Sequence, residues 1–168
     1  MDVAVHSSFD PKTDPDGFRA ALGRFVTGVT VVTTDSPEGP VAIVANSFAS
    51  VSLDPPLVLW CPAKASHRFE HFAGARRFAV HVLAHDQRDI CLAVLDSKTA
   101  IRKFPTHPSH CGMPLIDGVL ACFECNLAAT HDAGDHAIIV GEVTRATHRD
   151  GAPLVFQAGR YGLFAEEN

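Results

Sequence analysis

The chain has no hydrophobic run long enough to span a bilayer, and it begins MDVAVHSSFD, without the basic start and apolar stretch of a secretory signal. It also has no excess of basic residues. The net charge is -5 at pH 7 and both signs are interspersed, which disfavours nucleic acid or an anionic membrane as a partner. The five cysteines are an odd number, so they cannot all pair in intramolecular disulfides. These absences predict a cytoplasmic protein.

Two absent motifs narrow the chemistry. No Gly-x-Gly-x-x-Gly follows an expected strand, so a Rossmann dinucleotide site is not indicated. No Gly-x-Ser-x-Gly is present, which disfavours a hydrolase with a nucleophile elbow. The composition is ordinary for a globular protein, with 46% hydrophobic and 20% charged residues among 168. We predict a flexible N-terminal arm over residues 1–13 and one domain over residues 14–168.

The hydrophobic pattern predicts a mainly β protein with short helices. Strands are expected at 29–34, 41–45, 57–61, 78–83, 119–129, 136–147 and 154–156. The turn signal at 132–135 predicts a hairpin between the two longest strands. Since strands and helices do not alternate along the chain, an antiparallel barrel with covering helices is favoured over a parallel sheet.

Three helices are expected at the connections. The first starts at an Asp14 N-cap and carries Phe18, Leu22 and Phe25 at i, i+4 and i+7, which predicts a face packed on the core before Gly28 ends the element. The second would be capped by the hydroxyl of residue 66, and the third covers residues 86–95. A polar loop rich in proline and histidine is expected over 96–113.

The stretch 42–67 is the most informative part of the chain. Its two apolar segments enclose the polar sequence from Asn46 to Ser52, closed by a double proline. The second apolar segment, 57–61, lacks alternation and predicts a strand buried on both faces. Buried polar groups need partners, so a core strand does not ordinarily carry this many of them. The pattern indicates backbone and hydroxyl groups lining a pocket for a polar, planar ligand.

Five blocks resemble the flavin reductase family in the same order: 18–34, 45–56, 78–83, 134–136 and 159–161. The resemblance implies an antiparallel FMN-binding split barrel that forms a homodimer, with flavin near the subunit interface. It implies FMN or FAD as cofactor and NADH, or NADPH, as hydride donor. The implied activity is that of the reductase component of a two-component system, which passes reduced flavin to a partner monooxygenase.

The resemblance also implies site residues. The flavin ring and ribityl group would be contacted by Ala45, Asn46 and Ser47. The ribityl chain and phosphate would lie along Pro62, Ala63, Lys64 and Ser66. Phe104 would approach the flavin from the loop, and His136 would sit beside the nicotinamide as the catalytic residue, with Tyr161 close by. Departures at Ala49, His81 and the 96–112 loop leave the choice between FMN and FAD open.

Each of these signals has an ordinary structural alternative. Without the resemblance, Lys64 and Ser66 would indicate a solvated lysine and a helix cap, and His136 an exposed turn residue. Cys122 and Cys125 are spaced as C-x-x-C, but on a strand they point to opposite faces, which favours buried structural thiols.

The remaining interpretations concern metal binding and two alternative functions. His107, His110 and Cys111 lie in a proline-containing loop without regular ligand spacing, so no metal ligand is assigned. A flavin- or haem-binding barrel that acts as a carrier or sensor is the alternative function. An oxidase of a phosphorylated pyridoxal-like substrate is a weaker one, because the polar 46–56 block argues against it.

Overall fold

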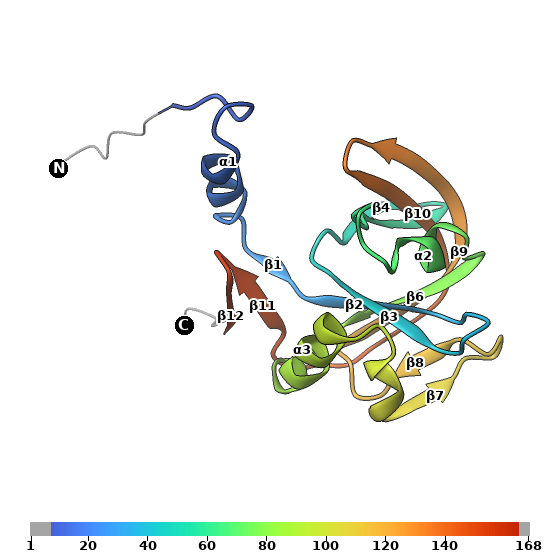
Figure 1. Ribbon diagram of the computed structural model, residues 1–168. Coiled ribbons are helices and arrows are strands. Elements are labelled where there is room, and N and C mark those ends of the chain that lie inside the picture. The colour runs from blue at the N-terminus through green and yellow to red at the C-terminus, as the bar shows by residue number, and fades with distance from the viewer. Residues whose placement is uncertain (1–7, 165–168) are drawn as a thin grey trace.

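The computed structural model describes residues 8–164 and is built around a seven-stranded sheet in which neighbouring strands run antiparallel (Figure 1). The strand order is β3-β2-β6-β9-β10-β5-β4. Its strands are β2 (Thr30–Thr34), β3 (Val41–Ala45), β4 (Ala49–Leu53), β5 (Pro56–Trp60), β6 (Arg77–Val82), β9 (Ala121–Ala133) and β10 (His136–His148). The predicted antiparallel, mainly β architecture is confirmed, as is the hairpin that turns at 134–135.

Smaller elements surround this sheet. One small sheet contains β1 (Thr27–Gly28), β11 (Leu154–Gln157) and β12 (Arg160–Leu163), and another contains β7 (Thr106–Pro108) and β8 (Pro114–Ile116). The helices are α1 (Pro15–Leu22), α2 (Phe69–Ala73) and α3 (Arg88–Asp96), with 3-10 turns η1 (His85–Gln87) and η2 (Ala100–Lys103). The predicted 96–113 loop therefore contains η2 and β7, which its proline and histidine content concealed.

The first core cluster lies on one face of the large sheet and centres on Trp60. Its indole packs edge-on against Phe72 of α2 and Phe78 of β6, with ring centroids 5.2 and 6.0 Å apart. Gly141 on β10 lies against the ring of Phe78, because a Cβ at this position would come within 2.5 Å of that ring. The prediction that 57–61 is buried on both faces was wrong, because only alternate residues, Val58 and Trp60, are buried. The large indole of Trp60 fills the core side of β5, and the side chains on its other face are half-buried.

The second core cluster lies on the opposite face, under α3. Val31 belongs to this cluster, whereas its neighbour Val32 belongs to the first, as the two-residue period of a strand requires. Ile90 and Val94 of α3 are buried against it, and Ala93 is half-buried. The expected inward face of this helix is therefore confirmed for Ile90 and Val94.

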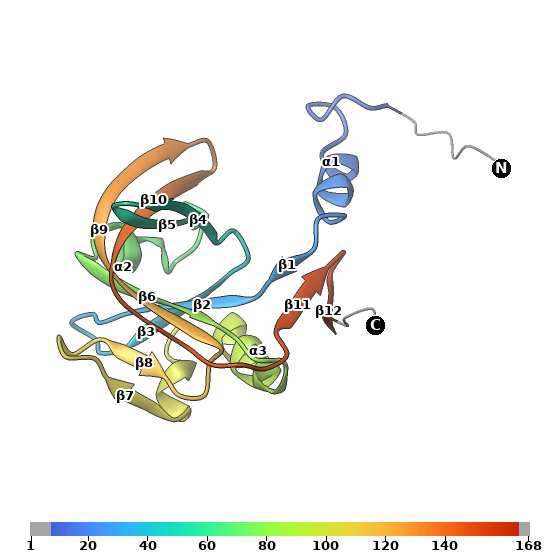
Figure 2. The same ribbon diagram turned by 180° about the vertical axis from the view of Figure 1, so that it is seen from behind.

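Helix α1 departs from its prediction. Asp14 caps it as expected, accepting from the Gly17 N–H at 2.8 Å, but the helix ends at Leu22 and has no buried residue. It stands away from the large sheet in both views (Figures 1 and 2). Phe18, Leu22 and Phe25 are 45, 59 and 78% exposed. The apolar face is real, but within one chain nothing in the described residues covers it.

Two remaining expectations concern termini and membranes. The predicted arm of residues 1–13 falls partly outside the described residues, while Asp10 accepts from the Thr13 and Asp14 N–H groups in a turn. Within residues 8–164, no helix combines the length and the apolar character needed to cross a bilayer.

Candidate flavin site

Two cavities meet at Asn46, directly after β3. The larger, about 680 Å³, lies between α1 and the β11–β12 turn, and the smaller, about 270 Å³, is lined by Val44, Leu95 and Tyr161. Asn46 and Phe156 line both cavities. The volume of the larger cavity is in the range of small-molecule sites, and the smaller cavity adjoins it at Asn46. The polar stretch after β3 therefore borders a pocket, as its composition predicts.

The walls of this pocket suit a flat ring with polar edges. Phe25 and Phe156 contribute aromatic surface to the larger cavity. Thr27 also lines it, and its buried Oγ1 has no hydrogen-bond partner among the described residues. A buried hydroxyl without a partner costs free energy unless a ligand satisfies it. Apolar walls with a few polar groups, here Thr27 and Asn46, fit the isoalloxazine of a flavin.

A second group of the predicted site residues lies where segment 61–66 contacts the β9–β10 turn. The Ala137 N–H donates to the Pro62 carbonyl at 3.1 Å, and the Lys64 N–H donates to the Asp135 carbonyl at 2.9 Å. Ala63 forms an isolated antiparallel bridge with His136. The fold thus brings Pro62, Ala63, Lys64 and His136 together, although more than 70 residues separate them in sequence.

Ser47 joins the two groups. Its Oγ accepts from the Cys61 N–H at 2.9 Å and lies 3.3 Å from the Cys61 carbonyl. Asn46 next to it lines the cavities, and Pro62 follows Cys61. Ala45 is only 8% exposed, and its carbonyl accepts from the Thr30 hydroxyl at 2.5 Å. The serine therefore holds the end of β5 against the strand that carries the pocket residues.

Lys64 is engaged with the β9–β10 turn. Its Nζ donates to Asp132 Oδ2 at 2.5 Å and to the Gly134 carbonyl at 2.7 Å. The hydrogen bond and charge of Lys64 lower the pKa of the Asp132 carboxyl. A phosphate ligand would have to share or replace these partners. Lys64 lies in the segment predicted to follow the ribityl chain and phosphate, but its ammonium group is already paired with the β9–β10 turn.

Ser66 is not the N-cap of α2, which was the prediction. The cap position is Arg68, and the Ser66 hydroxyl accepts from the Arg68 N–H at 3.2 Å in the turn before the helix. The guanidinium of Arg68 donates to the carbonyls of Val94 and Leu95, at the carboxyl end of α3. Two turn residues therefore separate Ser66 from Phe69, the first residue of the helix. The expected stop at Gly74 is confirmed.

His136 presents a half-exposed imidazole at the start of β10. Its Nδ1 lies 2.8 Å from Asp135 Oδ1, and this hydrogen bond lowers the pKa of the Asp135 carboxyl. Since a carboxylate only accepts, Nδ1 carries the proton and Nε2 is left as the second polar atom of the ring. The geometry therefore gives His136 a fixed orientation and one ring nitrogen for a ligand.

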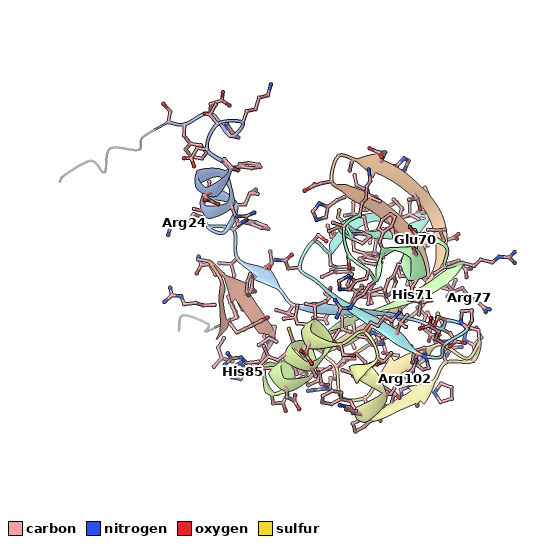
Figure 3. The ribbon with its side chains drawn as sticks, viewed as in Figure 1. Arg24, Glu70, His71, Arg77, His85 and Arg102 are labelled. Carbon is pink, nitrogen blue, oxygen red and sulfur yellow. The ribbon has the colours of Figure 1, made fainter. Side chains whose placement is uncertain are left out.

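Tyr161 lines the smaller Asn46 cavity, whereas Phe104 lines neither of the two Asn46 cavities. The Tyr161 hydroxyl is 3.3 Å from Cys91 Sγ, and burial, with the Cys91 contact, raises its pKa to about 12. Phe104 packs against the same core cluster as Tyr161. It follows η2, whose Arg102 donates to the Pro40 carbonyl at 3.1 Å on the β2–β3 turn (Figure 3). In the described part of one chain, His136 does not line the cavity of Tyr161.

A comparison with protein families identifies the family of this chain. The model of the flavin reductase like domain matches residues 22–164. The chain belongs to this family. The matched range covers all seven strands of the large sheet, the Asn46 pocket and the 61–66 segment, and it begins at the last residue of α1.

Individual members of the flavin reductase family are similar to this chain over most of its length. The chain is 55% identical over 150 residues to FMN reductase (NADH) SmoA of Agrobacterium fabrum, covering 89% of this chain and 86% of that protein. It is 40% identical over 153 residues to the reductase subunit HsaB of a flavin-dependent monooxygenase from Mycobacterium tuberculosis, covering 88% and 81%. Both relatives are covered over most of their length.

Solved structures of the flavin reductase family share the fold. The NADH:FAD oxidoreductase of Streptomyces globisporus superposes with a TM-score of 0.90 at 35% identity, covering 99% of this chain and 96% of that one. The flavin reductase component BorF of a bacterial two-component tryptophan halogenase superposes with a TM-score of 0.83 at 36% identity, covering 92% and 100%. The predicted split barrel is thereby confirmed.

The sequence did not single out several residues of the site. Thr27 and Phe156 line the Asn46 pocket, and Asp132 holds Lys64. Thr27 and Phe156 are paired across β1 and β11, at a sequence separation that no local pattern reveals. Asp132, two residues before the turn glycine Gly134, was a visible signal only for the turn itself.

Proposed function

We propose that this protein is an NADH-dependent flavin reductase that reduces FMN or FAD and supplies the reduced flavin to a partner monooxygenase. The observation that carries the proposal is the 55% identity to an FMN reductase (NADH) across 89% of the chain. A bound flavin supplies the hydride chemistry by accepting a hydride from NADH. The protein's own task is to bind and orient two flat rings and to exclude water.

Asn46, Phe156 and Thr27 supply the ring pocket in this proposal. The unsatisfied Thr27 hydroxyl and the Asn46 side chain are the polar groups available to a ring edge. Ser47 and Ala45 position the strand that carries Asn46, through the bonds to Cys61 and Thr30. The pocket walls act mainly by position, since hydride transfer between stacked rings needs no proton relay.

His136, Pro62, Ala63, Lys64 and Ser66 form the other half of the proposed site. Segment 61–66 would follow the ribityl chain and phosphate, with the Ser66 hydroxyl as a phosphate ligand. His136 would contact the nicotinamide through the ring nitrogen that Asp135 does not hold. This role is supported by its fixed ring and by its bridge to Ala63.

We infer that the functional form is a homodimer. Helix α1 has only eight residues and no buried side chain, and helices this short are marginal without packing. Phe18 and Leu22 are exposed on this helix, Phe25 extends the exposed apolar surface just after it, and Leu163 near the other end of the chain is 56% exposed. Because α1 also lines the larger cavity at Asn46, a second copy that covers this helix would help to close the flavin pocket.

A cytoplasmic location stays a prediction. All five cysteines are free thiols, which agrees with a reducing compartment.

The test is NADH consumption by the purified protein with added FMN, FAD or riboflavin. We expect NADH oxidation that depends on flavin and saturates with it. Flavin binding without NADH oxidation would favour the carrier alternative and contradict the proposal. The three flavins separate the contributions of the phosphate and of the adenylate. Riboflavin lacks the phosphate, so a higher KM for riboflavin than for FMN would support the phosphate contacts of segment 61–66.

A further inference from the structure

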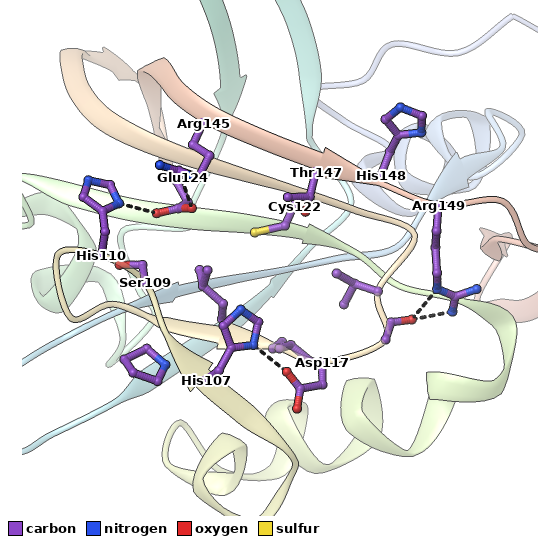
Figure 4. A pocket seen from close by; sticks show the side chains of 15 residues that line it. His107, Ser109, His110, Asp117, Cys122, Glu124, Arg145, Thr147, His148 and Arg149 are labelled. Carbon is purple, nitrogen blue, oxygen red and sulfur yellow. Dashed lines mark hydrogen bonds and ion pairs between the residues drawn. The ribbon is translucent and has the colours of Figure 1, made fainter.

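A third cavity lies apart from the Asn46 pocket (Figure 4). The β7–β8 hairpin forms one wall, and the first half of β9 and the last residues of β10 form the other. Its volume is about 500 Å³. The two Asn46 cavities share no lining residue with it. The proposed reductase chemistry therefore leaves this cavity and its side chains without a role.

Three possible metal ligands converge at one edge of this cavity, which His110 and Glu124 line and beside which Cys111 lies. One ligand atom each of His110, Cys111 and Glu124 lies within 4.8 Å of the other two. His110 and Cys111 come from the loop between β7 and β8, and Glu124 comes from β9. Sequence spacing alone favours a solvated loop, because the third member is 13 residues further on. The fold supplies the ligand that the loop lacks.

Glu124 is the unusual member of this cluster. Its side chain is 5% exposed, and its buried Oε2 has no hydrogen-bond partner among residues 8–164. His110 Nδ1 lies 3.5 Å from Oε2, and Arg145 Nε lies 3.8 Å from Oε1, both beyond good hydrogen-bond geometry (Figure 4). A buried carboxylate oxygen without a hydrogen bond is costly, and a bound cation would remove the cost that the more distant His110 and Arg145 leave.

The loop that carries the other two ligands is well defined. Ser109 Oγ accepts from the N–H groups of Cys111 and Met113 at 3.2 and 3.0 Å, and the Ser109 N–H donates to the Met113 carbonyl at 2.8 Å. Gly112 takes a positive φ of 86° and lets the turn close. The turn directs His110 and Cys111 toward Glu124, whose backbone is fixed in β9 between β6 and β10.

We propose that His110, Cys111 and Glu124 form a binding site for a borderline divalent transition ion, with Zn²⁺ as the best fit. One imidazole nitrogen, one thiolate and one carboxylate are Zn²⁺ ligands, whereas Mg²⁺ and Ca²⁺ prefer oxygen ligands throughout. With one thiolate and one carboxylate, the charge of the ion is neutralised. Tetrahedral bonds of about 2.0 to 2.3 Å place ligand atoms about 3.5 Å apart, so the loop has to close by about 1 Å.

The fourth coordination position would face the cavity and be taken by water. Three protein ligands with one open position differ from the four-ligand closed sites that hold small folds together. The ion would fasten the β7–β8 loop to β9. This site does not depend on the reductase activity, so failure of either proposal leaves the other standing.

The test is Co²⁺ and Zn²⁺ binding to the untagged full chain after chelator treatment. We expect one ion per chain, with a thiolate-to-Co²⁺ charge-transfer band and the visible bands of tetrahedral Co²⁺. Zn²⁺ should displace the Co²⁺ and abolish these bands. The absence of stoichiometric binding, or a Co²⁺ complex without the thiolate band, would overturn the assignment.

Variants assign the ligands. Cys111→Ser should abolish the charge-transfer band, and His110→Gln and Glu124→Gln should each raise the Kd by at least about tenfold, since even outer-shell partners of metal ligands contribute 10- to 100-fold. His110→Gln and Cys111→Ser lie on a surface loop and keep the test valid if Glu124→Gln unfolds. His107→Gln and Cys122→Ser are the matched controls, and both should bind like the wild type. Binding lost in Cys122→Ser and kept in Cys111→Ser would refute the site.

Discussion

A buried histidine makes the protein sensitive to mild acid. His81 lies on β6 with no exposed surface, and its Nδ1 is 3.0 Å from the Val31 carbonyl. The carbonyl accepts, so Nδ1 carries the proton, and Nε2 has no partner in the described part of the chain. Protonation would place a charge on Nε2 in the core. Burial accordingly lowers the pKa of His81 from 6.5 to about 4.

The size of the effect follows from that pKa. In the unfolded chain His81 takes up its proton near pH 6.5, whereas in the folded protein it does so only near pH 4. The unfolded state therefore binds more protons between these two values, and the stability that is present above pH 6.5 is lost as the pH falls toward 4. At about 1.4 kcal/mol per pKa unit, the loss approaches about 3 kcal/mol. This is a large part of the 5–15 kcal/mol typical of a domain.

The assay is chemical denaturation of the wild type and of His81→Asn over this pH range. Asparagine is chosen because it carries a polar group without titrating. The other acidic and basic groups are common to both proteins, so the pH dependence of the difference in unfolding free energy isolates His81. We expect the wild type to lose stability relative to the variant as the pH falls from 6.5. Parallel profiles for the two proteins would refute the reasoning that His81 stays neutral in the fold.

Three further predictions concern the proposed site and dimer. His136→Ala should raise the KM for NADH about fivefold while the flavin Kd stays nearly unchanged, because one hydrogen bond to a neutral group contributes about 1 kcal/mol. Steady-state kinetics and flavin titration measure the two effects, and unchanged kinetics would remove His136 from the site. Ser66→Asp should weaken FMN binding through like-charge repulsion with the phosphate, and an equal weakening for riboflavin would contradict that cause. Phe25→Glu should shift a dimer to monomer in analytical ultracentrifugation, because it puts a charge on the exposed apolar surface directly after α1, whereas Arg24→Glu serves as the charge control.

Local patterns determined the elements of this protein. The β-branched run before the first turn, the hairpin over 132–135 and the Asp14 cap are set by neighbours in sequence, and the structure has each of them. The polar stretch at Asn46 also predicted a pocket, because its polar groups could not be buried without hydrogen-bond partners. The flavin reductase resemblance was carried by short blocks that the family comparison confirms over residues 22–164.

Only the tertiary structure decided which of these elements meet. Periodicity shows that α1 has an apolar face, but not whether that face is covered, and in one chain it is exposed. His136 was expected beside the nicotinamide with Tyr161 close by, and within one chain Tyr161 lies with Asn46 and His136 with Ala63. Glu124 joins His110 and Cys111 only because the fold brings β9 against the loop between β7 and β8. Contacts between segments far apart in sequence depend on strand order and register, which local residue patterns do not encode.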